Sequence, residues 1–92
     1  MAQFVESGTP LNLTGTNTVS KASGNLLGFY VNNTSSGTLV LRVGADGAAS
    51  GTAISGTITP AIGWHRYPAY CPSGLHATIA NTLDVTFSFA AG

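Results

Sequence analysis

The side chains that could act as acids, bases, nucleophiles or metal ligands are few in this sequence of 92 residues. They are Glu6, Asp46, Asp84, His65, His76 and Cys71. His65, Cys71 and His76 lie close together in the sequence and could in principle hold a metal ion. Zinc sites, however, usually show tight pairs such as C-x-x-C or H-x-x-x-H, and neither pair is present. We therefore expect no metal and no cofactor.

Hydroxyl groups are the remaining candidates for nucleophilic catalysis. A Ser-His-Asp triad is defined in space and not in sequence, but the Gly-x-Ser-x-Gly elbow is absent, as is the double-His signature of metal-binding cupins. Asp46 lies in a Gly-rich stretch and Asp84 opens the last predicted strand, and both positions are typical of turn or edge residues. Threonine is common because it favours strands and hydrates an uncharged surface. We predict that the protein is not an enzyme.

The chain carries very little charge. Only 7% of its residues are charged and they sum to zero, whereas about 25% are charged in an average globular protein. Because a net charge near zero favours association, this composition indicates a protein that works within an assembly. The basic residues Lys21, Arg42 and Arg66 are spread along the chain and cannot neutralise a run of phosphates. Nucleic-acid binding is therefore not expected.

Membrane contact and secretion are not expected either. No apolar run approaches the roughly 18 residues of a membrane-spanning helix, so we expect no membrane contact. The first residues lack the basic and apolar regions of a secretory signal. The single Cys71 cannot form an internal disulfide, whereas small secreted domains usually contain several. These features favour synthesis and folding in a reducing cytosol.

Short segments rich in β-branched and aromatic residues alternate with clusters of Gly, Asn, Ser and Pro. The predicted strands are residues 11–13, 17–21, 26–32, 38–43, 53–59, 64–70, 75–80 and 83–89. About eight short strands separated by turn signals indicate an all-β fold, either a sandwich or a barrel. We expect residues 1–10 to form an extended N-terminal arm and residues 11–92 to form a single β domain.

Three features of this pattern can be tested directly. Residues 33–37 are all turn formers between two alternating segments, which predicts a hairpin loop between strands 26–32 and 38–43. Pro68 lies inside segment 64–70, which predicts an edge strand or an ordered loop there. The alternation of Val85, Phe87 and Phe89 with polar residues predicts a half-buried last strand.

The aromatic group Trp64, Tyr67 and Tyr70 has three interpretations. It could pack in the core or at a sheet edge, form an interface, or stack against a sugar. Packing is the more common role of such residues. Between the two binding roles, Trp, Tyr and Arg, here Arg66, are over-represented at binding hot spots, which favours an interface over a sugar site. A sugar site usually adds polar and acidic groups, and these are scarce in the neighbouring sequence. The predicted interface residues are Phe4, Val5, Leu11, Trp64, Arg66, Tyr67 and Tyr70.

Four segments, in this order, resemble small virion proteins of tailed bacteriophages, in particular capsid decoration (cement) proteins. They are LGFYVNNTSSGTLVLRVG from Leu27, ISGTITPAIG from Ile54, GLHATIA from Gly74 and DVTFSF from Asp84. The resemblance covers residues 26–89. It implies a jelly-roll-like antiparallel β-sandwich that binds the outside of an expanded head, often as trimers. Such proteins brace neighbouring capsomers against the pressure of packaged DNA.

The resulting expectation is a non-enzymatic structural protein of a bacteriophage head. It would be synthesised in the bacterial host cytoplasm and would lie on the outer capsid surface of the virion. Its partners would be the major capsid protein and further copies of itself, as a homotrimer or a dimer. A virion-surface carbohydrate-binding module and a tail or neck adaptor component are the alternatives.

Overall fold

The computed structural model describes residues 9–91, which form one antiparallel β-sheet of six strands. The strands are β1 (Thr9–Leu13), β2 (Asn17–Ser20), β3 (Gly24–Val43), β4 (Thr52–Ala53), β5 (Gly63–Cys71) and β6 (Leu75–Ala91), with a short 3-10 turn η1 (Ala45–Gly47) after β3. The all-β class predicted from the sequence is confirmed. Within residues 9–91, no helix is long and apolar enough to cross a membrane.

Strands β3 and β6 form the centre of the sheet and are much longer than the others, with 20 and 17 residues. They pair from Gly24 opposite Ala91 to Val43 opposite Leu75. β5 pairs with the first part of β3 and β4 with its end. On the other side, β2 pairs with the start of β6 and β1 with its second half. The four shorter strands therefore lie at the edges of the sheet.

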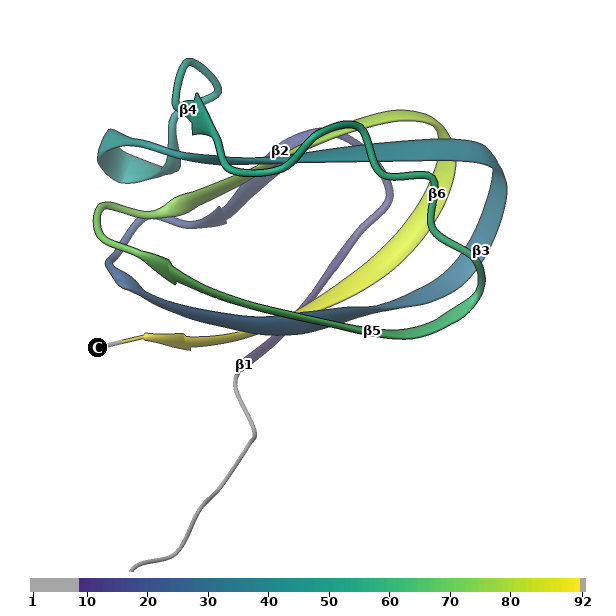
Figure 1. Cartoon of the computed structure of the whole chain (residues 1–92), viewed down its shortest axis with the longest axis horizontal. Helices are drawn as coiled ribbons and strands as arrows, with labels where there is room; N and C mark the ends of the chain where they lie inside the picture. The colour runs from purple at the N-terminus through teal and green to yellow at the C-terminus, as the bar shows by residue number, and fades with distance from the viewer. Residues whose placement is uncertain (1–8, 92) are drawn as a thin grey trace, which may run out of the picture.

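The sheet folds over on itself because β3 and β6 both bend near their middles (Figure 1). The register of β3 shifts twice in this region, and bulges of this kind bend a strand and increase its twist. Ser36 and Asn81 have left-handed backbone, with φ of 55° and 61°, and the Asn81 side chain donates a hydrogen bond to the Ser36 carbonyl at 2.8 Å. One half of the sheet contains β1 and β5, and the other contains β2 and β4.

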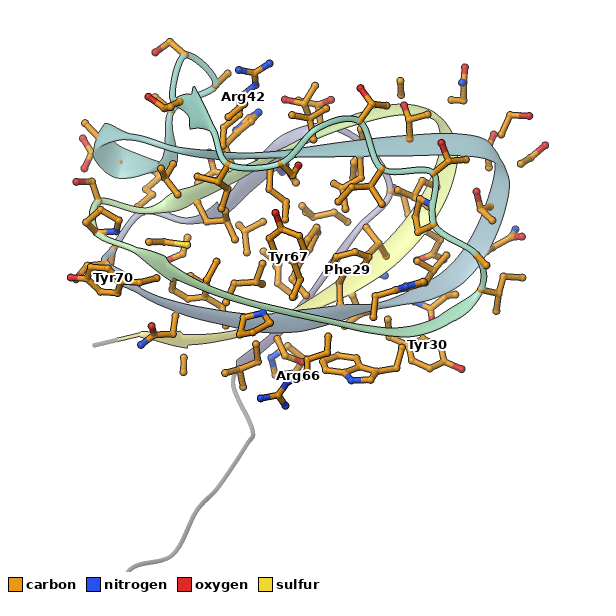
Figure 2. The ribbon with its side chains drawn as sticks, in the orientation of Figure 1. Phe29, Tyr30, Arg42, Arg66, Tyr67 and Tyr70 are labelled. Carbon is orange, nitrogen blue, oxygen red and sulfur yellow. The ribbon has the colours of Figure 1, made fainter. Side chains whose placement is uncertain are left out.

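The core lies between the two halves of the folded sheet. Its fully buried larger side chains are Leu26, Phe29, Val31, Leu39 and Leu41 from β3, Cys71 from β5, and Leu75, Leu83, Val85 and Phe87 from β6. The Phe29 and Phe87 rings meet with centroids 5.8 Å apart. Figure 2 shows Phe29 pointing into this interior. Since burying one such side chain contributes about 1.5–3 kcal/mol, this cluster is the main source of stability.

The predicted hairpin at residues 33–37 is wrong. Segments 26–32 and 38–43 do not pair with each other but belong to the single strand β3, and both pair with β6. Gly37 explains why: a β-carbon there would lie 2.5 Å from the Thr82 carbonyl oxygen, so glycine allows the two long strands to approach at the bend. The predicted strands 75–80 and 83–89 are likewise the continuous strand β6.

Two further predictions are corrected, one in the middle of the domain and one at its N-terminal end. Of the predicted strand 53–59, only Ala53 lies in β4, and Ile58 makes an isolated bridge with Leu39. Thr9 and Pro10, predicted as part of the arm, pair with β6 as the start of β1. The rest of the predicted arm, residues 1–8, lies outside the described residues.

Candidate functional site

The residues that could act as acids, bases, nucleophiles or metal ligands each contact different groups. His65 stacks on Phe29, with ring centroids 5.3 Å apart, and its Nε2 donates to the Ala61 carbonyl at 2.7 Å. His76 is buried in β6, and neither of its ring nitrogens has a hydrogen-bond partner in the part of the chain that the structure describes. Asp46 lies in η1 with φ of 56°, a turn conformation that Asp tolerates. No group of three or more His, Cys, Asp or Glu side chains in residues 9–91 could hold a metal ion.

Cys71 ends β5 with its thiol buried in the core. The Sγ atom lies 3.7 Å from the Ala69 carbonyl oxygen. Burial raises the pKa of the Cys71 thiol, and a backbone hydrogen bond from Leu26 offsets part of that rise. Because the thiolate is the reactive form, the burial and the raised pKa both disfavour a nucleophilic role for this cysteine.

Strand β5 carries most of the residues predicted to form an interface. Among the described strands it pairs only with β3, so it is an edge strand, as its proline predicted. Trp64, Arg66 and Tyr70 are exposed on its outer side. Tyr67 points inward instead, packs against the core and donates to the Ile54 carbonyl at 2.9 Å (Figure 2).

The remaining predicted interface residues have different places. Leu11 is partly buried and packs against the hydrophobic core from β1. It therefore contributes to the fold more than to the surface. Phe4 and Val5 lie outside the described residues.

An open groove of about 390 Å³ follows the edge of β5. It is lined by Ile54, Arg66, Tyr67, Pro68, Ala69 and Tyr70. Three of the predicted interface residues thus line one groove, and the hydrogen bond from Tyr67 to the Ile54 carbonyl joins its two sides.

A second surface lies on the outer face of the half that contains β1 and β5. The strand register places Asn12, Thr86, Tyr30 and Trp64 in one row across β1, β6, β3 and β5. Directly opposed residues have β-carbons about 4.5–5.5 Å apart, so neighbours in this row are in contact range. Of the four, only Trp64 was singled out from the sequence. The alternation along each strand indicates which side chains face outward, but it does not give the register between strands.

Trp64 and Tyr30 form the aromatic end of this row. Their side chains are 51% and 46% exposed. Trp64 lies over Gly28, where a β-carbon would come within 2.8 Å of the indole atoms Cη2 and Cζ2. Beside the indole is a hollow of about 280 Å³ lined by Leu27, Trp64, Arg66 and Pro68. The absence of a side chain at position 28 therefore lets the indole lie close to the sheet, next to an open hollow.

A network of polar side chains forms the other end of the row. Asn12 Nδ2 donates to Asp84 Oδ1 at 2.6 Å and to Thr86 Oγ1 at 3.2 Å. Asn32 Nδ2 donates to Thr86 Oγ1 at 3.0 Å and lies 3.4 Å from Asp84 Oδ1. Polar residues are scarce near Trp64 in the sequence. In the fold, these groups come from three strands, and the register places them on the same face as Trp64.

Comparison with known proteins gives no relative on which to base a function. No family model matches the chain, and neither the curated proteins nor the solved structures contain a match. The function is therefore inferred from the groove along β5 and from the outer face beside it.

Proposed function

We propose that this chain is a non-enzymatic structural protein that decorates a bacteriophage head and stabilises the capsid by bracing neighbouring major capsid proteins. The observation that carries the proposal is the open groove along β5, lined by Arg66, Tyr67 and Tyr70. Tyr and Arg are common anchors of protein interfaces. The unpaired side of an edge strand also offers backbone groups that can bind a strand of another protein.

The surface composition supports a docked protein. The chain exposes 5030 Å², and one standard interface covers about 800 Å² of each partner. A trimer subunit that meets two siblings and the shell would use three such patches, about half of that surface. With only 7% charged residues, few ions would have to lose their hydration on docking.

An array of such subunits does not need tight individual contacts. Once one contact of an oligomer has formed, the others bind at high effective concentration, and overall affinity rises without any new contact. This favours a homotrimer, with a dimer as the alternative. Sedimentation analysis of the purified protein distinguishes a trimer from a dimer.

We also infer that the folded sheet is a jelly-roll-like β-sandwich. The supporting observation is that β3 and β6 each run through both halves and enclose the buried side chains between them. An experimental structure of the assembled protein tests this, because the edges left open in a single chain would be closed by neighbouring copies.

Binding to expanded heads assembled without this protein tests the proposed function. We expect the purified protein to bind the heads and to raise the temperature at which they release DNA. Because Tyr70 is 64% exposed in the groove, Tyr70→Ala is expected to weaken head binding by about 30-fold, a typical hot-spot effect.

The matched control is Tyr30→Ala, which removes an exposed tyrosine outside the groove, at the opposite end of the same half of the sheet (Figure 2). This variant is expected to bind heads as the parent protein does. Heads that release DNA at the same temperature with and without the protein would show that the stabilising role is wrong.

A further inference from the structure

The outer face beside the groove combines two kinds of binding group. At one end, Tyr30 and Trp64 lie directly opposite each other on β3 and β5. Both rings are about half exposed, and the indole is held over Gly28. An aromatic face carries partial negative charge, so it attracts the weakly positive C–H groups on one side of a pyranose ring. The pair therefore forms a platform on which a sugar ring can stack.

The other end supplies hydrogen-bond acceptors in fixed orientations. The amide nitrogens of Asn12 and Asn32 are both directed into the network around Asp84 and Thr86. This leaves Asn12 Oδ1, Asn32 Oδ1 and Asp84 Oδ2 without a donor from residues 9–91. A carboxylate and two amide oxygens suit a ligand with several hydroxyl donors.

From these two ends, we propose that this face is a saccharide-binding site for a neutral oligosaccharide. The row of Asn12, Thr86, Tyr30 and Trp64 crosses four strands, and three steps between strands make about 14 Å. That length fits two or three pyranose units. The hollow of about 280 Å³ beside the indole lies just below the usual range of ligand-pocket volumes, about 300–1,000 Å³, which suits a single ring.

The chemistry of this face favours a neutral ligand. Asp84 gives the polar end a negative charge, which disfavours phosphate or uronic acid groups there. The paired rings of Tyr30 and Trp64 form an open platform, and not the enclosing cage that binds quaternary ammonium ions. The site goes beyond the proposed structural role and does not depend on it.

The intrinsic fluorescence of Trp64 provides a direct assay, since it is the only tryptophan in the chain. We expect saturable fluorescence changes with at least one neutral trisaccharide from a panel of maltotriose, cellotriose, mannotriose and chitotriose. Shift perturbations in ¹H–¹⁵N spectra are expected to be confined to the indole N–H and to the side-chain amides of Asn12 and Asn32. A glycan array that includes bacterial surface polysaccharides then distinguishes free sugars from a cell-surface source.

The variants separate this site from the groove. Tyr30→Ala is expected to weaken saccharide binding roughly tenfold, the upper range for a single aromatic contact. Asp84→Asn keeps the shape of the side chain but removes its charge and one acceptor, and it is expected to weaken binding as well. Tyr70→Ala is expected to leave saccharide binding unchanged. Far-ultraviolet circular dichroism checks that each variant is folded.

Three results would overturn the proposal. The first is the absence of binding by every panel member at millimolar concentration. The second is an equal loss of affinity in Tyr70→Ala and Tyr30→Ala, which would place the ligand elsewhere. The third is saturable binding of choline in place of sugars. Head binding of the same variants is a separate test. If only Tyr70→Ala weakens head binding, the result concerns the groove and not the saccharide site.

Discussion

Replacing Gly47 by alanine is expected to lower the free energy of unfolding by about 2–5 kcal/mol, for two separable reasons. Gly47 ends η1 with φ of 66°, and this left-handed backbone costs a residue with a side chain about 1–2 kcal/mol. A β-carbon would also lie 2.4 Å from Thr18 Cγ2 and 2.5 Å from the Ser20 carbonyl oxygen. Forcing η1 away from β2 is an overpacking effect of about 1–3 kcal/mol.

This loss is large for a chain of this size, whose total stability is expected to be about 5–14 kcal/mol. It is measured by thermal and urea denaturation followed by circular dichroism. Since 1 kcal/mol shifts the Tm of such a domain by about 4–8 °C, the variant should melt at least 8 °C lower.

Two other glycines separate the backbone contribution from the contact contribution. Gly63 has φ of 128° but no atom near its missing β-carbon, so Gly63→Ala is expected to lose only the backbone strain, about 1–3 kcal/mol. Gly56 has neither a positive φ nor a close neighbour, so Gly56→Ala is expected to be neutral or to stabilise by about 0.4–1 kcal/mol. If Gly47→Ala is no worse than Gly56→Ala, the docking of η1 described above is refuted.

Three further outcomes are expected from buried polar groups. His76→Leu should raise the free energy of unfolding in urea denaturation, because it removes two buried nitrogens that have no partner among residues 9–91, each worth about 1–3 kcal/mol. His65→Leu loses a hydrogen bond and should lower the free energy of unfolding. The raised pKa of Cys71 means that the folded thiol holds its proton more tightly than the unfolded one; stability should fall as pH rises above about 8.5, and Cys71→Ala should abolish that part of the decrease. Tyr67→Phe should lose about 0.5–1.5 kcal/mol and should speed hydrogen exchange around Ile54, to which the hydroxyl is bonded.

Local alternation was enough to predict which side chains are buried on the last strand. Val85, Phe87 and Phe89 are buried as their period of two predicted. The same alternation could not predict that residues 33–37 bend a strand instead of closing a hairpin. Turn-forming residues are compatible with both, and the outcome depends on how closely β6 approaches Gly37, a contact between distant parts of the chain.

The candidate sites show the same limit. Trp64, Arg66 and Tyr70 are exposed on an edge strand, but Tyr67 faces the core because it has the opposite phase on β5. The polar network around Asp84 was missed because its members belong to three strands. Which residues meet across strands is set by register, and register depends on the packing of the whole sheet.

The continuous pairing of β3 with β6 also constrains the order in which the chain can fold. The pair closest in sequence is Val43 with Leu75, and the most distant is Gly24 with Ala91. Because closing a longer loop costs more conformational entropy, pairing is expected to start at Val43 and to extend through the bend at Asn81. A change at the bend, such as Asn81→Ala, should therefore slow refolding in stopped-flow experiments, whereas a change near Gly24 should mainly speed unfolding.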